Sequence, residues 1–215
     1  MILAESEAEL QRAITALQEY RDKWDLRINI DKTKVLVFSR GKIRKLPTLE
    51  IAGTKIDIVF SYKYLGVIFH YNNSFKETIT YSISKANKAV FSLTALARQR
   101  NLKIQTILEL FDRTVVPVLL YGCEVWGHEN LEQIEIFQRK FLRRVMGITY
   151  NAPIPMIYGE LGRKHLEITI KQRMLTFWHR LENQTDWRIT TTLLKITKQD
   201  YCRNYTATNW LRGIK

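Results

Sequence analysis

The chain has few of the residues that build disulfide frameworks or zinc sites. Its 215 residues include only two cysteines, Cys123 and Cys202, and four histidines. No histidine lies at metal-binding spacing from a cysteine or from another histidine, so a zinc site is not predicted. The distance between the two cysteines argues against a disulfide-stapled scaffold and favours a reducing compartment.

Long apolar runs are also missing. No stretch reaches the roughly 18 consecutive apolar residues that a membrane-spanning helix needs. The first nine residues carry three glutamates and no lysine or arginine, so they lack the charged start of a signal peptide. We therefore expect neither a membrane span nor a secretory leader.

What the chain has in excess is positive charge. It contains 34 Lys and Arg against 21 Asp and Glu, which gives a formal net charge of +13. A hydrophobic fraction of 46% is enough for a packed core, so disorder is not the default expectation. Such a charge predicts a polyanionic partner, with nucleic acid first and an acidic membrane surface second. A basic protein with no such partner remains a third interpretation.

The first third of the chain is expected to form a helix followed by a small antiparallel sheet. Apolar residues recur at helical spacing in residues 4–23, and Ser6 followed by Glu9 resembles a capping box. Strands are predicted at residues 34–38, 49–52, 55–60 and 64–70, with the middle two joined as a hairpin across Gly53-Thr54. Gly66 falls inside the last of these strands, which indicates a bulge or a close approach by another backbone.

The rest of the chain is expected to be helical. Helical periodicity occurs in residues 75–100, 103–121, 130–147, 152–161 and 165–183. Pro117 predicts a kink or boundary inside the second segment, and Gly147 is a suitable terminator of the third. The predicted fold class is α+β, with an N-terminal helix and small sheet followed by an all-helical bundle. No structure is predicted for the tail, residues 184–215.

In residues 26–38, Asn29, Lys32 and Thr33 come before a Val-Leu-Val-Phe strand. This pattern resembles motif D of non-LTR, LINE-type retrotransposon reverse transcriptases of the jockey-like kind. The Tyr-Leu-Gly-Val-Ile-Phe run at 64–69 is similar to their primer-grip strand. Matches to the region after the palm continue at residues 85–89, 116–127, 138–147, 158–163 and 173–181.

The resemblance implies a domain assignment. Residues 1–73 would be the C-terminal part of the polymerase palm, with motif D-like and primer-grip-like strands. Residues 74–183 would be a helical thumb-like region, and residues 184–215 match nothing in the family. The family's location would be the nucleus or the cytoplasm.

The resemblance also implies that the catalytic carboxylates are elsewhere. In the family the catalytic Tyr/Phe-x-Asp-Asp turn comes just before the segment that residues 1–7 resemble. Two-metal polymerase chemistry needs clustered carboxylates. The seven aspartates here include no adjacent pair. We therefore expect a truncated chain that is inactive alone, with Mg²⁺ required only in an intact polymerase and with the upstream palm and fingers segment as its partner.

Four candidate nucleic-acid contacts lie in the N-terminal part. Lys32 matches the motif D lysine, which by resemblance helps to place or protonate the leaving pyrophosphate. Lys34 is a weaker candidate beside it, as is the basic loop of residues 40–45. Tyr64 would pack against the primer backbone, and Gly66 would let that backbone approach. The alternatives are surface lysines, core aromatic rings and a simple bulge.

The strongest local candidate is the basic helix predicted at residues 130–147. Phe137, Phe141 and Val145 would hold it on the core. The opposite face carries four cations within about two turns: Arg139, Lys140, Arg143 and Arg144. Like charges at i,i+4 cost a few tenths of a kcal/mol unless an anion meets them, so we expect phosphate contacts here. A solvated charged stripe is the alternative.

Two other functions stay open. The chain could belong to a complete reverse transcriptase whose upstream exon is missing from the sequence. It could also be a domesticated helical module that binds a protein, which predicts an apolar rather than a basic exposed face.

The truncation also has a consequence for solubility. Strands without their palm neighbours would leave an exposed sheet edge and a tendency to aggregate.

Overall fold

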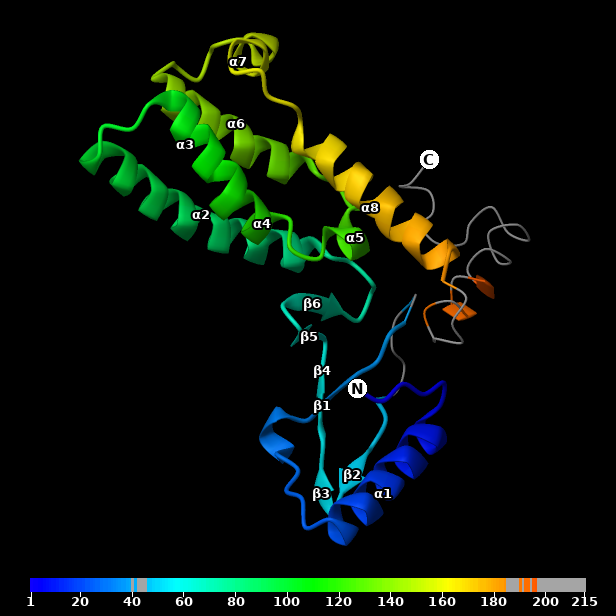
Figure 1. Ribbon diagram of the computed structural model, residues 1–215. Helices are drawn as coiled ribbons and strands as arrows, with labels where there is room; N and C mark the ends of the chain where they lie inside the picture. Colours follow the sequence, from blue (N-terminus) through cyan, green and yellow to red (C-terminus); the bar gives the residue numbers. More distant parts are fainter. Residues whose placement is uncertain (40, 42–45, 185–189, 191, 194, 197–215) are drawn as a thin grey trace. The chain divides into compact units, whose positions relative to one another are not determined.

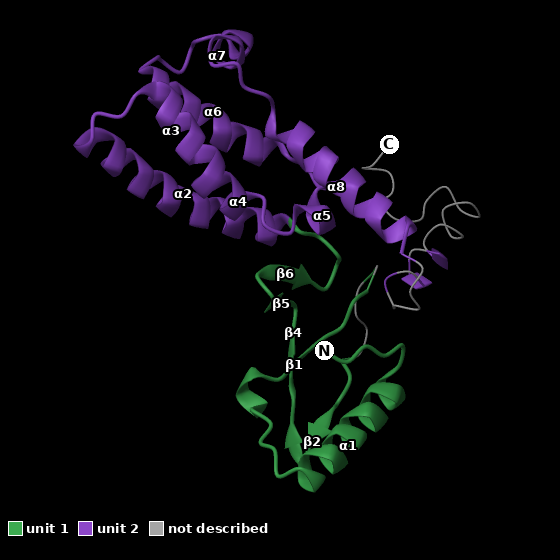
Figure 2. Ribbon diagram, in the orientation of Figure 1, with its two compact units in different colours: residues 1–75 green, residues 76–215 purple. Residues whose placement is uncertain are grey.

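The computed structural model describes residues 1–39, 41, 46–184, 190, 192–193 and 195–196. The chain divides into two compact units, residues 1–75 and residues 76–215 (Figure 2). The predicted tail and the basic loop at 40–45 lie largely outside the described residues. Each unit is described by itself.

Unit 1 begins with helix α1 (Glu7–Lys23). The Ser6 side chain caps it by accepting a bond from the Glu9 N–H at 3.2 Å, as the predicted capping box requires. The Glu9 carboxylate reaches the N–H of Glu5 instead of that of Ser6. The predicted helix is therefore confirmed, and its first turn lies three residues later than expected.

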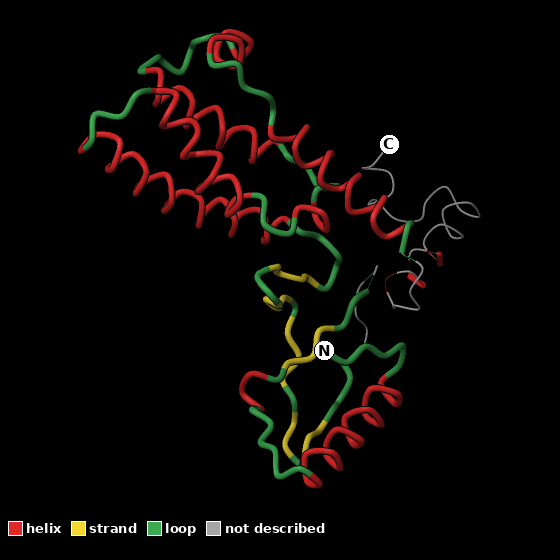
Figure 3. Tube along the Cα trace, in the orientation of Figure 1, coloured by secondary structure: helices red, strands yellow, loops and turns green. Residues whose placement is uncertain are grey.

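Three short strand pairs follow α1 in unit 1 (Figure 3). After the single 3₁₀ turn η1 (Ile30–Lys32), the strands are β1 (Lys34–Leu36), β2 (Glu50–Ile51), β3 (Thr54–Lys55), β4 (Asp57–Val59), β5 (Ser61–Tyr64) and β6 (Val67–His70). The pairs β2–β3 and β5–β6 are antiparallel hairpins. The pair β1–β4 is parallel, in the register Val35 to Ile58. Small strand pairs beside a helix agree with the predicted α+β class.

Both hairpins turn through residues with positive φ. The β2–β3 hairpin was predicted, but its turn is Ala52-Gly53, with φ of 49° and 77°, one residue earlier than expected. The prediction of one continuous strand over 64–70 is wrong, because Leu65 and Gly66 have φ of 48° and 88°. Two consecutive residues with positive φ form the type of two-residue turn whose twist matches that of the flanking strands. The turn explains Gly66 without a bulge inside a strand.

The core of unit 1 lies between α1 and the strands. It consists of five buried side chains: Ile14, Val35, Leu49, Ile51 and Ile56. The Gln11 amide lies along β2, where it both accepts from the Glu50 N–H and donates to the Glu50 carbonyl, each at 3.1 Å. A side chain of α1 thus satisfies backbone groups that an open strand edge would leave exposed.

In residues 76–184 of unit 2, the regular secondary structure that is described consists of helices joined by turns and loops (Figure 1). Its helices are α2 (Lys76–Gln99), α3 (Ile104–Leu110), α4 (Val116–Leu119), α5 (Cys123–Trp126), α6 (Glu132–Met146), α7 (Ile154–Glu160) and α8 (Leu166–Glu182). Helix α6 packs against α2, α3, α7 and α8, and α8 also packs against α5. Phe141 of α6 stacks on Phe111, with ring centroids 4.0 Å apart.

The predicted irregularity near Pro117 takes the form of a π-helical turn. Residues Phe111–Val115 join α3 to α4, and the Val116 N–H donates to the Phe111 carbonyl, five residues back. Pro117 has no N–H to continue the α-helical ladder. Gly147 ends α6 with φ of 67°, as predicted. Helix α5 was not predicted.

Candidate nucleic-acid interface

Lys32 ends the turn η1, and its backbone is held from two sides. Its N–H donates to Asn29 Oδ1 at 3.0 Å, and its carbonyl accepts from the Tyr62 hydroxyl at 3.1 Å. The side chain is exposed. Asn29, part of the motif D resemblance, therefore acts here as a turn cap. The ammonium of Lys32 extends from a fixed backbone position.

Lys34 is already engaged inside unit 1. Its Nζ lies 2.5 Å from Asp57 Oδ2, and the two residues are directly opposite in the parallel β1–β4 pair. Only 22% of the Lys34 side chain is exposed. A carboxylate already pairs with this cation, and a contact between Lys34 and phosphate remains a prediction. The pairing depends on strand register, which the sequence alone did not reveal.

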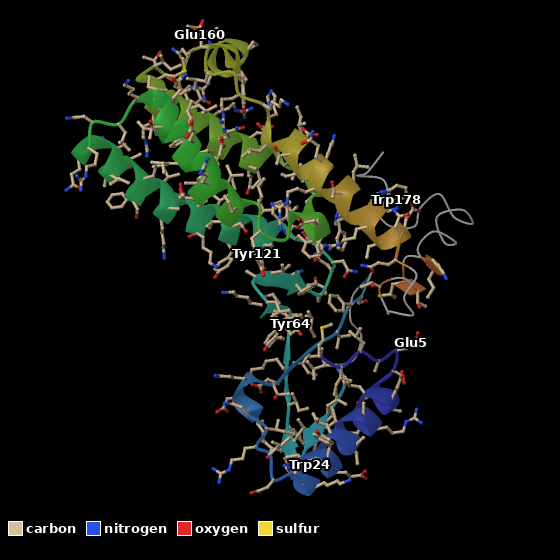
Figure 4. All side chains as sticks on the ribbon, in the orientation of Figure 1. Glu5, Trp24, Tyr64, Tyr121, Glu160 and Trp178 are labelled. Atoms are coloured by element: carbon tan, nitrogen blue, oxygen red, sulfur yellow. The ribbon has the colours of Figure 1, made fainter. Side chains whose placement is uncertain are left out.

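Tyr64 and Gly66 belong to the β5–β6 hairpin. Tyr64, labelled in Figure 4, pairs with Val67 next to the turn. Both Tyr64 and Gly66 are half-buried. The hairpin carries Lys63 on its exposed side. The two candidate residues therefore lie together at one end of a hairpin, where Gly66 supplies the turn geometry. A contact with a primer remains a prediction.

The four cations of α6 do not form one free basic face. Arg139 Nη2 lies 2.5 Å from Glu132 Oε1, and 15% of the arginine side chain is exposed. The Arg143 guanidinium carbon lies 5.1 Å from the centroid of the Tyr150 ring. Both arginines are thus held by neighbours within unit 2. A contact between either arginine and nucleic acid remains a prediction.

Lys140 and Arg144 are the exposed members of the set. They lie one turn apart on α6, and neither has an ion-pair partner among the residues that the structure describes. Phe137 and Phe141 are buried on the other side of the helix, as predicted, while Val145 is half-buried. We call Lys140 and Arg144 the α6 basic pair.

A buried polar cluster, missed from the sequence, holds α7 and α8 against α6. Glu135 Oε2 accepts from the Tyr158 hydroxyl at 2.9 Å and lies 3.0 Å from His165 Nδ1, while its Oε1 accepts from the Glu167 N–H at 2.8 Å. Gln138 donates to the Lys164 carbonyl at 3.1 Å. Glu135 and Gln138 lie three residues apart on the side of α6 that also buries Leu142, which was the available signal.

The cluster fixes the position of the basic helix against α7 and α8. Burial and the bond to Glu135 raise the pKa of Tyr158 well above its usual range.

Glu124, another acidic residue of unit 2, pairs with Arg173 at 2.7 Å. In the described part of the chain, no group of three or more His, Cys, Asp or Glu side chains could hold a metal ion. No helix among the described residues is long and apolar enough to cross a membrane.

Comparison with known proteins confirms the resemblance seen in the motifs. The chain is 30% identical over 149 residues to the RNA-directed DNA polymerase from mobile element jockey of Drosophila funebris, covering 67% of this chain and 16% of that protein. The Drosophila melanogaster jockey polymerase is 29% identical over 142 residues, covering 64% of this chain and 15% of the relative. The probable RNA-directed DNA polymerase from transposon BS of the same species is 22% identical over 177 residues, covering 80% and 20%.

The alignment is local with respect to the relatives. The chain spans about a sixth of the length of the curated jockey polymerases that it matches. No family model matches the chain. No solved structure matches it either.

Proposed function

The chain is homologous to one region of jockey-like non-LTR retrotransposon RNA-directed DNA polymerases, and on this premise we propose that it binds the template–primer. In this proposal residues 1–73 are the end of the palm and carry the primer-grip hairpin, and residues 74–183 form a thumb-like bundle. The chain contributes grip, while the upstream palm and fingers of an intact enzyme contribute bond making.

The observation that carries the proposal is the α6 basic pair. Lys140 and Arg144 are exposed one turn apart, where their mutual repulsion costs a few tenths of a kcal/mol. The helix dipole stabilises the positive charge of Arg144 in the last turn of α6. Its effect is confined to that turn, so it does not stabilise the charge of Lys140. Phosphate oxygens on a nucleic-acid backbone would compensate both charges.

The buried cluster supports this use of α6. Glu135 and Gln138 fix the helix to α7, to α8 and to the segment between them through hydrogen bonds with Tyr158, Lys164 and Glu167, so the two cations extend from a rigid element. Rigid placement reduces the ordering cost that binding must overcome. Binding through phosphates alone would be independent of base sequence.

Mg²⁺ is implied for an intact polymerase, but the described residues do not fit a magnesium site. Two-metal phosphoryl chemistry needs carboxylates gathered within a few ångströms. The described aspartates lie on separate elements, and Asp57 and Asp112 are paired with Lys34 and Arg163. No step of polymerisation is therefore assigned to a residue of this chain.

The binding test measures the affinity for a short RNA–DNA hybrid as a function of salt. We expect the association constant of the wild-type chain to fall about tenfold or more between about 50 and 200 mM salt. The double variant Lys140→Glu/Arg144→Glu should bind more weakly, and its log–log salt slope should be smaller by about two. The matched control is Arg12→Glu/Lys23→Glu, which makes the same charge change at exposed positions of α1.

Two results would contradict the proposal. One is an affinity for hybrid that does not change with salt, or no affinity at all. The other is an equal loss in the α6 and α1 double variants, which would mean that only net charge matters. Primer extension by the isolated chain with Mg²⁺ tests the second part: extension would show that the chain supplies catalytic groups.

A further inference from the structure

The segment after α6 brings an aromatic ring back onto the basic end of that helix. Gly147 adopts φ of 67°, and the Ile148 N–H donates to the Arg143 carbonyl at 3.2 Å, which reverses the chain. Tyr150 then lies over Arg143, with 5.1 Å between the guanidinium carbon and the ring centroid. Arg143 Nη2 also donates to the carbonyl of Ala152, two residues after Tyr150 in the sequence, at 3.4 Å.

Tyr150 is among the most exposed large side chains of the described residues, at 80% exposure. The stack on Arg143 occupies only one side of the ring. Because Arg143 is tied both to the ring and to the backbone of residue 152, the ring is held in place although it is open to solvent. An ordered, exposed aromatic face over a guanidinium is a surface on which a planar group can stack.

The sequence on either side of this ring carries an excess of positive charge. Residues 136–159 contain no Asp or Glu, and the same stretch carries Lys140, Arg143 and Arg144, besides Arg139, which is paired with Glu132. Lys140 lies three residues before Arg143 on α6, so these two side chains are neighbours on the helix surface, and the exposed Arg144 follows Arg143 in the last turn of the helix. A planar group that stacks here should therefore be linked to negative charge.

From this geometry we infer that Tyr150 is a stacking site for an unpaired base of a single-stranded nucleic acid. The base stacks on the face of the Tyr150 ring opposite the Arg143 guanidinium. The phosphates on either side of that base contact the α6 basic pair. This inference rests on the proposed template–primer binding and adds to it the single-stranded part of the template. Paired bases within a duplex already stack on each other, so Tyr150 distinguishes an overhang from blunt duplex.

The experiment compares two probes on the full chain: a blunt RNA–DNA hybrid, and the same hybrid with a short single-stranded RNA overhang that carries a fluorescent adenine analogue. The wild-type chain should bind the overhang probe more tightly and quench the analogue. Tyr150→Ala should lower overhang affinity by roughly five- to a hundredfold and abolish the quenching, with blunt-hybrid affinity unchanged. Tyr150→Phe keeps the ring and should keep both properties.

The control variant is Tyr20→Ala, which removes an exposed tyrosine from α1. Full overhang preference in Tyr150→Ala, or an equal loss in Tyr20→Ala, would overturn the inference. Loss of quenching in Tyr150→Phe would also overturn it, because the ring would not be the active part. These outcomes leave blunt-hybrid binding intact, whereas failure of the proposed function would remove salt-dependent binding of both probes.

Discussion

The Tyr158 hydroxyl donates a 2.9 Å hydrogen bond to Glu135 Oε2 in the interior of unit 2. Glu135 is 5% exposed and Tyr158 is 6% exposed, so water contributes little to the carboxylate. The same carboxylate accepts from the N–H of Glu167 in the first turn of α8. One buried acid thus connects three helices, and each of its donors is needed to offset the cost of its burial.

Removing one donor should therefore be expensive. Tyr158→Phe deletes the hydroxyl, so the buried Glu135 carboxylate loses one hydrogen-bond donor. We therefore expect the free energy of unfolding to fall by about 1–3 kcal/mol. Urea unfolding followed by circular dichroism measures the change. Tyr150→Phe, which removes an exposed hydroxyl, is the matched control and should change stability by less than about 0.5 kcal/mol. Equal effects of the two substitutions would show that the Glu135 bond contributes nothing specific.

Gly127 makes the close approach of α5 to α8 possible. A Cβ at this position would lie 2.5 Å from Ile170 Cγ2, 2.6 Å from the Cys123 carbonyl oxygen and 2.7 Å from Met174 Sδ. Because one of these atoms belongs to the backbone, Gly127→Ala should destabilise unit 2 by about 1–3 kcal/mol. Thermal unfolding provides the measurement.

Gly159→Ala is the control for that substitution. Gly159 lies in α7, and a Cβ there would meet nothing within 4 Å. Alanine is the better helix former, so stability should be unchanged or rise by up to about 1 kcal/mol. If both alanine variants behaved alike, the steric account of Gly127 would be wrong.

The turn of the β5–β6 hairpin gives a third prediction. Gly66 has φ of 88°, a conformation that costs a residue with a Cβ about 1–2 kcal/mol. Gly66→Ala should lower the stability of unit 1, and Gly66→Asn should lower it less, because Asn enters this region more easily. Proteolysis in native buffer, with cleavage mapped around residues 61–70, reports the change. Equal protection of all three proteins would argue against a turn-based role for this glycine.

Much of the fold was accessible from periodicity and terminators. The long helices followed from apolar residues at three- and four-residue spacing, and Gly147 from the need for positive φ at a helix end. The turn at Leu65-Gly66 was missed because Leu65 is apolar and continues the strand-like run on both sides. Leu65 nevertheless takes positive φ, in the turn between the paired residues Tyr64 and Val67.

The site was less predictable than the fold because its charges depend on long-range partners. Glu132, seven residues before Arg139, is local, but Asp57 reaches Lys34 only through the parallel β1–β4 register. A pattern of cations on α6 could not distinguish Arg143, held by Tyr150 and Ala152, from the exposed Arg144. The stacking site likewise exists only because the chain reverses at Gly147.

The buried thiol of Cys123 gives a pH-dependent prediction. Desolvation raises its pKa from 9.0 to about 12. The folded state therefore keeps the proton that the unfolded state loses above pH 9, so this contribution to stability is present below pH 9 and is lost as pH rises toward 12. In a Cys202→Ser background, the free energy of unfolding should fall above pH 9 more steeply than in Cys123→Ala, by at most about 1.4 kcal/mol per pH unit. Thiol reagents, which need the thiolate, should modify Cys123 in that background only on unfolding. Parallel pH profiles for the two proteins, or rapid labelling of the native chain, would show that this thiol titrates as an ordinary exposed cysteine does.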